Sequence, residues 1–311
     1  MKNFKWLSLL VLLFSVLIFG GYNWKVLKNQ DKLGPVITMD EAQIYVSIKD
    51  DESVLLKGVT ATDNKDGDVT SSLVIESISS FVDGKRYVNY AAFDSDNHVS
   101  KASRKVVYTD YTPIRFSLEE PLRFPVITSG TLDVLGYIYA EDCLDGDISD
   151  RITFSEDSSI SVYSADEYEV TIEVTNSAGD MAELPVTITM YDTATENAAP
   201  KIQLSEYLVY TKTGQALDAR GYLESVTYRG TEYGITSERG TFAVDTSAMG
   251  QDELSAFQNE QQTSPSVSLE KFKITDEVDY QTPGVYEIQY ELTDDEENVG
   301  NVNLVVVVEE E

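Results

Sequence analysis

A chain of 311 residues has room for two or three domains of ordinary size, and its 42% apolar content is that of a globular protein. It carries 54 Asp and Glu against 23 Lys and Arg, a formal net charge of −31, which disfavours nucleic acid and anionic lipid as partners because both would be repelled. One cysteine, Cys143, excludes a disulfide within the chain, and one histidine, His98, leaves a single candidate base for a Ser-His-Asp or Cys-His device. We therefore expect no nucleic-acid partner and no enzyme.

The N-terminus predicts a membrane-spanning helix. An apolar stretch from Trp6 to Trp24 would span roughly 28 Å as a helix, close to the thickness of the hydrocarbon layer. Its aromatic ends, which include Tyr22, suit the membrane interface. A cleaved signal peptide is the alternative, although no small-residue cleavage pattern follows the stretch. We expect an uncleaved signal anchor through residues 6–24, within a tail, anchor and linker over 1–33, and the bulk of the chain outside the cell.

Beyond this linker the chain repeats itself three times. Each segment opens on a proline beside β-branched residues, which suits the first residue of an edge strand because the missing N–H does no harm there. These prolines are Pro35, Pro113 and Pro200. Each segment closes on two strands with alternating apolar residues, joined by a turn of Asp, Asn, Ser or Gly. The pattern predicts three sandwich domains of seven strands each, over 34–110, 111–193 and 194–311.

The third segment differs in its middle. Residues 227–273, approximately, form an insert rich in Gly, Ser, Gln and Glu. A loop of this length inside a compact domain is usually functional or disordered. We expect disorder or a small decorative helix, with a binding loop as the alternative.

An acidic, glycine-centred loop marks the first two segments. Residues 61–70 read Ala-Thr-Asp-Asn-Lys-Asp-Gly-Asp-Val-Thr, and 79 residues later 140–149 read Ala-Glu-Asp-Cys-Leu-Asp-Gly-Asp-Ile-Ser. Together with the proline opening and the closing pattern Pro-Gly-Val-Tyr-Glu-Ile-Gln-Tyr-Glu-Leu-Thr-Asp at 283–294, this resembles the bacterial immunoglobulin-like repeats of Gram-positive surface proteins and crystal toxins. The resemblance covers nearly everything after residue 33, but the third segment lacks the acidic loop.

This resemblance implies a fold class and a role. The fold is all-β, with three tandem immunoglobulin-like β-sandwiches after the N-terminal transmembrane helix. The role is that of an extracellular spacer, stalk or adhesive module. The resemblance implies no catalytic residues.

The acidic loops are candidate calcium sites, because calcium takes six to eight oxygen ligands from flexible loops of such composition. The candidate ligands of the first loop and of the turn that could approach it are Asp63, Asp66, Asp68, Asp94 and Asp96, and those of the second loop are Asp142, Asp145 and Asp147. The alternative is structural, since Asp and Asn in such loops also bond backbone N–H groups. The structural interpretation is favoured, with calcium as the one cofactor considered.

Other conspicuous residues receive structural interpretations. We expect His98 to be a surface turn residue, and Cys143, at the position of Asn64 in the first loop, to be an inert small residue rather than an intermolecular crosslink. The 19 tyrosines fall mostly on alternating strands, where Tyr is a good β residue, which disfavours a sugar-binding face.

These patterns predict a non-catalytic, membrane-anchored extracytoplasmic protein that serves as a spacer, adhesion or protein-interaction module on a bacterial surface. Its partner would be an unknown surface protein or glycan. The alternative is a glycan or cell-wall polymer binding protein that uses the insert of the third segment. That alternative predicts an exposed aromatic cluster around Tyr228, Tyr233 and Phe242.

Overall fold

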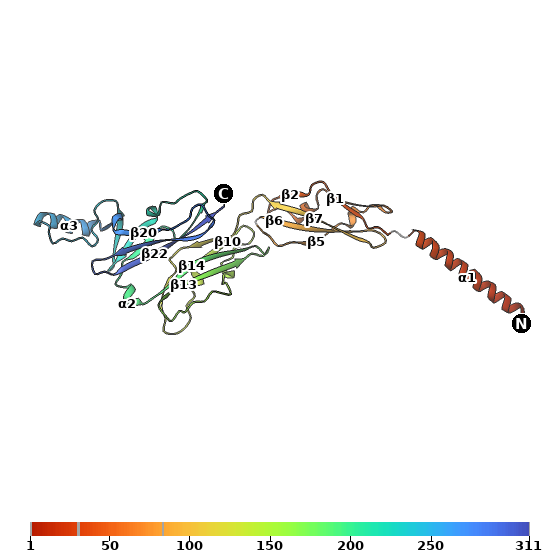
Figure 1. Ribbon diagram of the computed structural model, residues 1–311, viewed down its shortest axis with the longest axis horizontal. Helices are drawn as coiled ribbons and strands as arrows, with labels where there is room; N and C mark the ends of the chain where they lie inside the picture. Colours follow the sequence, from red (N-terminus) through yellow and green to blue (C-terminus); the bar gives the residue numbers. More distant parts are fainter. Residues whose placement is uncertain (1, 30–31, 83, 311) are drawn as a thin grey trace. The chain divides into compact units, whose positions relative to one another are not determined.

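The computed structural model describes residues 2–29, 32–82 and 84–310. The chain divides into two compact units, unit 1 (1–111) and unit 2 (112–311). The α-helices of the described part are α1 (Lys2–Asn29), the single turn α2 (Thr193–Glu196) and α3 (Gln251–Thr263) (Figure 1). Apart from these and short 3-10 turns the regular structure is strand, so the predicted all-β class is confirmed.

Helix α1 is apolar on all sides. Its stretch Ser8–Lys25 has a mean hydropathy of 1.4 and is long and apolar enough to cross a membrane. Large side chains such as Phe14 and Phe19 are exposed along it. A helix that is hydrophobic all round needs an apolar surrounding, which fits either a membrane span or a signal sequence.

Unit 1 is built from two facing sheets. One sheet has the order β1-β3-β4 and the other β2-β7-β6-β5. The strands are β1 (Val36–Met39), β2 (Gln43–Val46), β3 (Val59–Asp63), β4 (Gly67–Asp68), β5 (Val74–Ile78), β6 (Lys85–Phe93) and β7 (Val99–Tyr108). Alternate residues of β6, Val88 and Tyr90, pack with Val59 of β3 and Val106 of β7 in one core. This period of two is what the sequence predicts for a half-buried strand.

Unit 2 contains four sheets. The first two, in the orders β11-β10-β8 and β12-β13-β14-β9, use residues 115–191. Their strands are β8 (Arg115–Leu118), β9 (Arg123–Pro125), β10 (Ile138–Asp142), β11 (Gly146–Asp147), β12 (Thr153–Phe154), β13 (Asp166–Thr175) and β14 (Met181–Tyr191).

The other two sheets of unit 2, in the orders β15-β17-β18-β19 and β16-β22-β21-β20, use residues 201–309. Their strands are β15 (Lys201–Leu204), β16 (Leu208–Lys212), β17 (Leu223–Tyr228), β18 (Thr231–Thr236), β19 (Ser266–Ser268), β20 (Phe272–Asp276), β21 (Gly284–Thr293) and β22 (Val299–Glu309). The buried residues of all four sheets form one continuous hydrophobic cluster, which is why the second and third sequence segments make a single compact unit.

Polar contacts reinforce this junction inside unit 2. Arg115 pairs with Glu309 at 2.8 Å, and its guanidinium lies 4.1 Å from the centre of the Tyr210 ring. The backbone N–H of Thr187 donates to Glu287 Oε1 at 3.0 Å. Each of these contacts joins residues 95 or more positions apart, so it connects the second segment to the third.

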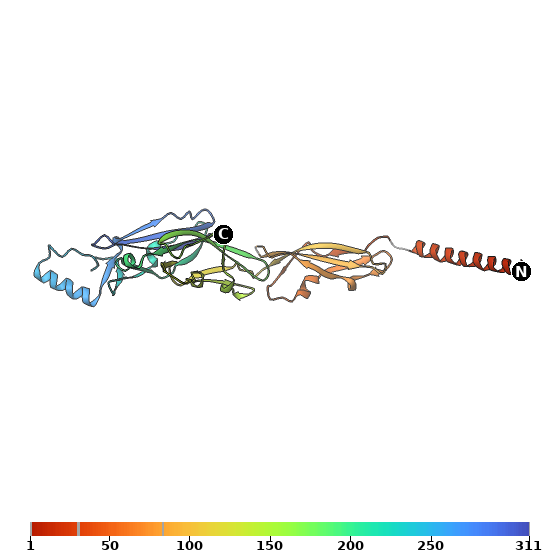
Figure 2. The same ribbon diagram turned by 90° about the horizontal axis from the view of Figure 1, so that it is seen from below.

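The structure corrects the prediction that residues 227–273 form an insert of disorder or a small helix alone. Within it, β18 pairs antiparallel with β17, and β19 pairs parallel with β18, so both are part of a sheet. The rest includes α3, which has no buried residue in its described length and projects from the sheets of unit 2 (Figure 2). A small decorative helix was therefore the right expectation for α3. The sequence analysis did not predict β18 and β19, because these strands are short and lie in a stretch of polar composition.

Gly300 provides a test of the packing in unit 2. A Cβ added to this residue of β22 would lie 1.7 Å from the carbonyl oxygen of Pro200. Gly300→Ala should therefore force the backbone apart, cost about 3 kcal/mol and lower the melting temperature of unit 2 by roughly 6–12 °C in circular dichroism. Gly221→Ala is the control, because nothing lies within 4 Å of its added Cβ. Equal melting temperatures for the two variants would contradict the close approach.

Candidate functional site

The first acidic loop, between β3 and β4, is closed by its own carboxylates. Asp63 Oδ1 accepts hydrogen bonds from the backbone N–H groups of Lys65 at 2.7 Å and Asp66 at 2.9 Å. Asp68 Oδ1 accepts one from Thr70 N–H at 2.9 Å. Gly67 has a φ of +76°, a conformation that side chains rarely adopt. These carboxylates therefore act locally as turn formers.

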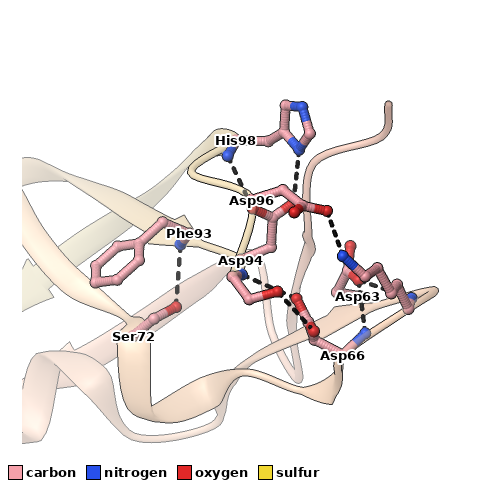
Figure 3. Close-up of polar contacts among 9 residues, drawn as sticks. Asp63, Asp66, Ser72, Phe93, Asp94, Asp96 and His98 are labelled. Carbon is pink, nitrogen blue, oxygen red and sulfur yellow. Dashed lines mark hydrogen bonds and ion pairs between the residues drawn. The ribbon is translucent and has the colours of Figure 1, made fainter. Parts of the chain in front are cut away.

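The loop is also tied to the turn between β6 and β7. Asp66 Oδ2 accepts from the backbone N–H of Ser95 and Asp66 Oδ1 from its hydroxyl, both at 2.9 Å (Figure 3). Lys65 Nζ pairs with Asp96 Oδ2 at 2.5 Å across the same gap. Because the loop follows a strand of one sheet and the turn joins two strands of the other, these bonds hold the two sheets together at this end.

The turn itself is organised by Asp94. Its Oδ1 accepts from the backbone N–H of His98 at 2.8 Å, and its Oδ2 lies 2.8 Å from His98 Nδ1. Asp94 is 4% exposed, whereas about a third of the His98 side chain is exposed. His98 is thus a partly exposed turn residue that holds a buried carboxylate, rather than a side chain free on the surface.

The second acidic loop repeats this arrangement. Asp142 Oδ2 accepts from the backbone N–H groups of Leu144 at 2.8 Å and Asp145 at 2.9 Å. Asp145 then accepts from the backbone N–H of Ser177 at 2.7 Å and from its hydroxyl at 2.6 Å. Arg151 adds an ion pair to Asp145 at 2.5 Å.

Two further residues that the sequence analysis singled out in this loop are Asp147 and Cys143. Asp147 accepts from the backbone N–H of Ser149 at 3.0 Å and from its hydroxyl at 2.6 Å, as Asp68 does from the backbone of Thr70. Cys143 is a half-buried free thiol.

The third segment makes the corresponding contact with different residues. Tyr228, at the end of β17, donates its hydroxyl to Asp294 Oδ2 at 2.7 Å. Asp294 Oδ1 accepts from the backbone N–H groups of Glu296 and Asn298. Burial, followed by the bond to Asp294, raises the pKa of Tyr228 to about 12. Sequence reasoning missed this pair, although Asp294 occupies the turn position of Asp94.

The glycan-binding alternative predicts an exposed aromatic cluster, and this prediction is wrong. Tyr228, Tyr233 and Phe242 do come together, but they are only 8%, 8% and 2% exposed. Phe242 packs edge-on against both tyrosine rings, with centroids 5.3 Å apart in each pair. Part of the insert therefore completes the core of unit 2 instead of presenting a stacking platform.

Calcium binding at the two acidic loops stays a prediction. Asp63, Asp66, Asp94 and Asp96 gather at the first loop, and Asp142 and Asp145 at the second. Within residues 2–29, 32–82 and 84–310, no group of three or more His, Cys, Asp or Glu side chains is arranged to hold a metal ion.

No protein-family model and no curated protein matches the chain. Among solved structures, the second CBM51 module with GlcNAc and INT domains of Clostridium perfringens ZmpB is similar at 25% identity, over 46% of this chain and 29% of that one, with a TM-score of 0.21. The lipoprotein BT2262 of Bacteroides thetaiotaomicron is similar at 11% identity, over 62% of this chain and 98% of that one, with a TM-score of 0.22. The chain thus spans less than a third of the ZmpB structure, and TM-scores this low support no conclusion about fold or function.

The bridge from Asp66 to Ser95 should contribute measurably to the stability of unit 1. Asp66→Ala removes two hydrogen bonds and should lower the free energy of unfolding by about 2 kcal/mol in urea titrations. Ser95→Ala keeps the backbone bond and loses only the hydroxyl bond, so about half that loss is expected. An unchanged free energy of unfolding in both variants would show that the bridge contributes nothing to stability.

Acid should destabilise the protein through these carboxylates. Hydrogen bonds from Thr70, Ser149 and Ser177 hold the pKa values of Asp68, Asp147 and Asp145, respectively, below the ordinary value of 3.8. A carboxyl group whose pKa is lower in the folded state contributes stability that is complete above its unfolded pKa and is lost as the pH falls through the folded one.

We therefore expect urea midpoints that are constant from about pH 7 to pH 5 and fall below about pH 4. Asp145→Asn should weaken the acid dependence of unit 2, because Ser177 then bonds a group that does not titrate. Midpoints unaffected by acid would contradict the depressed pKa values.

Proposed function

We propose that this chain is a non-catalytic, membrane-anchored extracytoplasmic protein that acts as a spacer, adhesion or protein-interaction module. In this proposal α1 is an uncleaved anchor, and residues 34–110, 111–193 and 194–311 are three immunoglobulin-like sandwiches. The observation that carries the proposal is a bond to the turn between the last two strands in each segment. The acidic loop makes this bond in the first two segments, through Asp66 and Ser95 and through Asp145 and Ser177, and the end of β17 makes it in the third, through Tyr228 and Asp294.

The chemistry of the loops supports a role without catalysis. A general acid at neutral pH needs a raised carboxyl pKa, whereas those of Asp68, Asp145 and Asp147 are lowered. Asp66 and Asp145 have both oxygens occupied by a serine. Such carboxylates are suited to closing a domain end.

The junction inside unit 2 supports a spacer. The second and third segments share one hydrophobic cluster and the Arg115–Glu309 ion pair. Two domains that share a core bend less at their junction than domains joined by a linker. The glycan-binding alternative loses its main support, because its three aromatic residues are buried.

Membrane orientation can be tested with the native thiol. Cys143 is the one cysteine of the chain, so a membrane-impermeant maleimide applied to intact cells reports on the side that holds unit 2. We expect labelling equal to that in detergent-lysed cells, none in Cys143→Ser, and a protein mass that retains α1. Labelling only after lysis, or a mass that lacks α1, would contradict the proposal.

Binding to the cell wall separates the spacer from its alternative. The full chain in detergent is mixed with purified wall polymer and sedimented. A spacer is expected to stay in the supernatant at micromolar concentrations. Sedimentation that a soluble glycan competes away would establish the glycan-binding alternative instead.

A further inference from the structure

The negative charge of the chain is unevenly distributed. Unit 2 holds 40 of the 54 acidic residues but only 10 of the 23 basic ones, which leaves 14 acidic and 13 basic residues in unit 1. Repulsion from an anionic surface therefore acts mainly on unit 2, and unit 1 can approach such a surface.

Lysines gather on one side of unit 1. Val88 of β6 and Val106 of β7 point into the core, so the odd-numbered residues of these two strands lie on the opposite side of the sheet β2-β7-β6-β5. We call this side the outer face. Its three lysines are Lys85, Lys101 and Lys105.

A single carboxylate balances these lysines. Glu76 is the one acidic residue in the four strands of the sheet, and it pairs with Lys101. Lys85 and Lys105 pair with no carboxylate in the part of the chain that the structure describes. The outer face therefore keeps a positive charge.

Apolar side chains share the outer face with the lysines. In the described part of residues 34–111, seven large hydrophobic side chains are exposed, and five of them lie on this face. These five are Tyr45, Val74, Tyr87, Phe93 and Val99. Lysines together with exposed aromatic rings suit the interface between a membrane and water.

The matching strands of the second segment carry the opposite charge. Aligned on their turns, β6 and β7 precede β13 and β14 by 82 positions. At this spacing Lys85 corresponds to Glu167, and Lys101 corresponds to Glu183. The cationic face thus belongs to the first segment alone and is not a requirement of the repeated strand pair.

The chain enters unit 1 at one end of the outer face. A Cβ added to Gly34 would lie 2.8 Å from Ser100 Oγ and 3.8 Å from the carbonyl carbon of Val99. Helix α1 ends at Asn29, five residues before Gly34, and five residues span at most about 18 Å. With α1 in a membrane, this end of the outer face must lie near the membrane surface.

The carboxylates at this end do not belong to the outer face. Asp66 and Asp68 lie in the loop of the opposite sheet, and packed sheets are about 10 Å apart. That separation exceeds a Debye length of about 8 Å, so these charges are largely screened from a surface that the outer face touches.

We propose that the outer face of unit 1 lies on the anionic lipid headgroups of the membrane that α1 spans. Lys85 and Lys105 contact headgroup phosphates, and Tyr45 and Tyr87 enter the interface. This inference rests on the membrane anchor of the proposed function. It gives the spacer a second attachment to the membrane, through its first segment.

Fluorescence quenching on the full chain in vesicles tests this inference. The chain carries Cys143→Ser and a labelled thiol from either Ser103→Cys, on the outer face, or Thr60→Cys, on the opposite sheet; both positions are exposed. The vesicles contain phosphatidylcholine, about 30% phosphatidylglycerol and a quencher on the headgroups. The label at position 103 should be strongly quenched, the label at position 60 much less, and about 0.5 M salt should remove the difference.

The second segment supplies the matched variant. Lys85→Glu with Lys105→Thr gives β6 and β7 the residues of β13 and β14, so the melting temperature should not change. Each lysine near an anionic surface favours binding about fivefold, so the double variant should weaken docking at least about 25-fold and reduce quenching at position 103 to that at position 60. Lys49→Glu with Lys57→Thr makes the same change of net charge off the outer face and should keep the quenching.

Alkaline extraction of the vesicles separates this inference from the proposed function. If extraction releases the protein, α1 does not span the bilayer and both are overturned. If the protein stays but the two labels are quenched equally, only the docking of unit 1 is overturned. Docking is also overturned if the label at position 103 responds instead to soluble polyphosphate or to the density of protein in the vesicles, since a soluble polyanion or a second copy then occupies the face.

Discussion

The bond between an acidic loop and the turn joining the last two strands is the constraint on which the sandwich ends depend. In unit 1 the loop continues the β1-β3-β4 sheet and the turn belongs to the β2-β7-β6-β5 sheet. The apolar core between these sheets is non-directional and fixes neither end by itself. The two bonds between Asp66 and Ser95 are directional, and they hold the loop at one place on the turn.

The same geometry carries different electrostatics in different segments. Asp63 and Asp142 bond their own loops alike, yet Asp142 also accepts a hydrogen bond from the side-chain amide of Asn176, whereas Asp63 Oδ2 is buried without a hydrogen-bond partner. At the matching turn position the first segment has Asp94, whose carboxylate oxygens are both held by His98. Two loops of like sequence can thus keep the same local bonds and still differ in whether the carboxylate at the strand end is bonded to the turn.

Unit 2 shows how neighbouring segments lose their independence. One hydrophobic cluster contains buried residues of both segments, from Ile114 to Val308. The polar contacts at the junction also use residues from both segments. The junctions between the repeats of one chain can therefore differ in stiffness. For a spacer, a shared core makes part of its length stiff, because bending at that junction would expose apolar surface to water.

The sequence by itself determined the features that depend on nearby residues. The alternating strands at β6, β13 and β21, the apolar helix α1 and the turn-forming role of the loop carboxylates follow from side-chain period or from bonds two or three positions apart. Only the tertiary structure decided that Tyr228, Tyr233 and Phe242 are buried and that Tyr228 meets Asp294, 66 positions away. It alone also decided that Asp63 Oδ2 lacks a partner. Burial and pairing of this kind are set by which strands face each other across the core, and no local pattern encodes that.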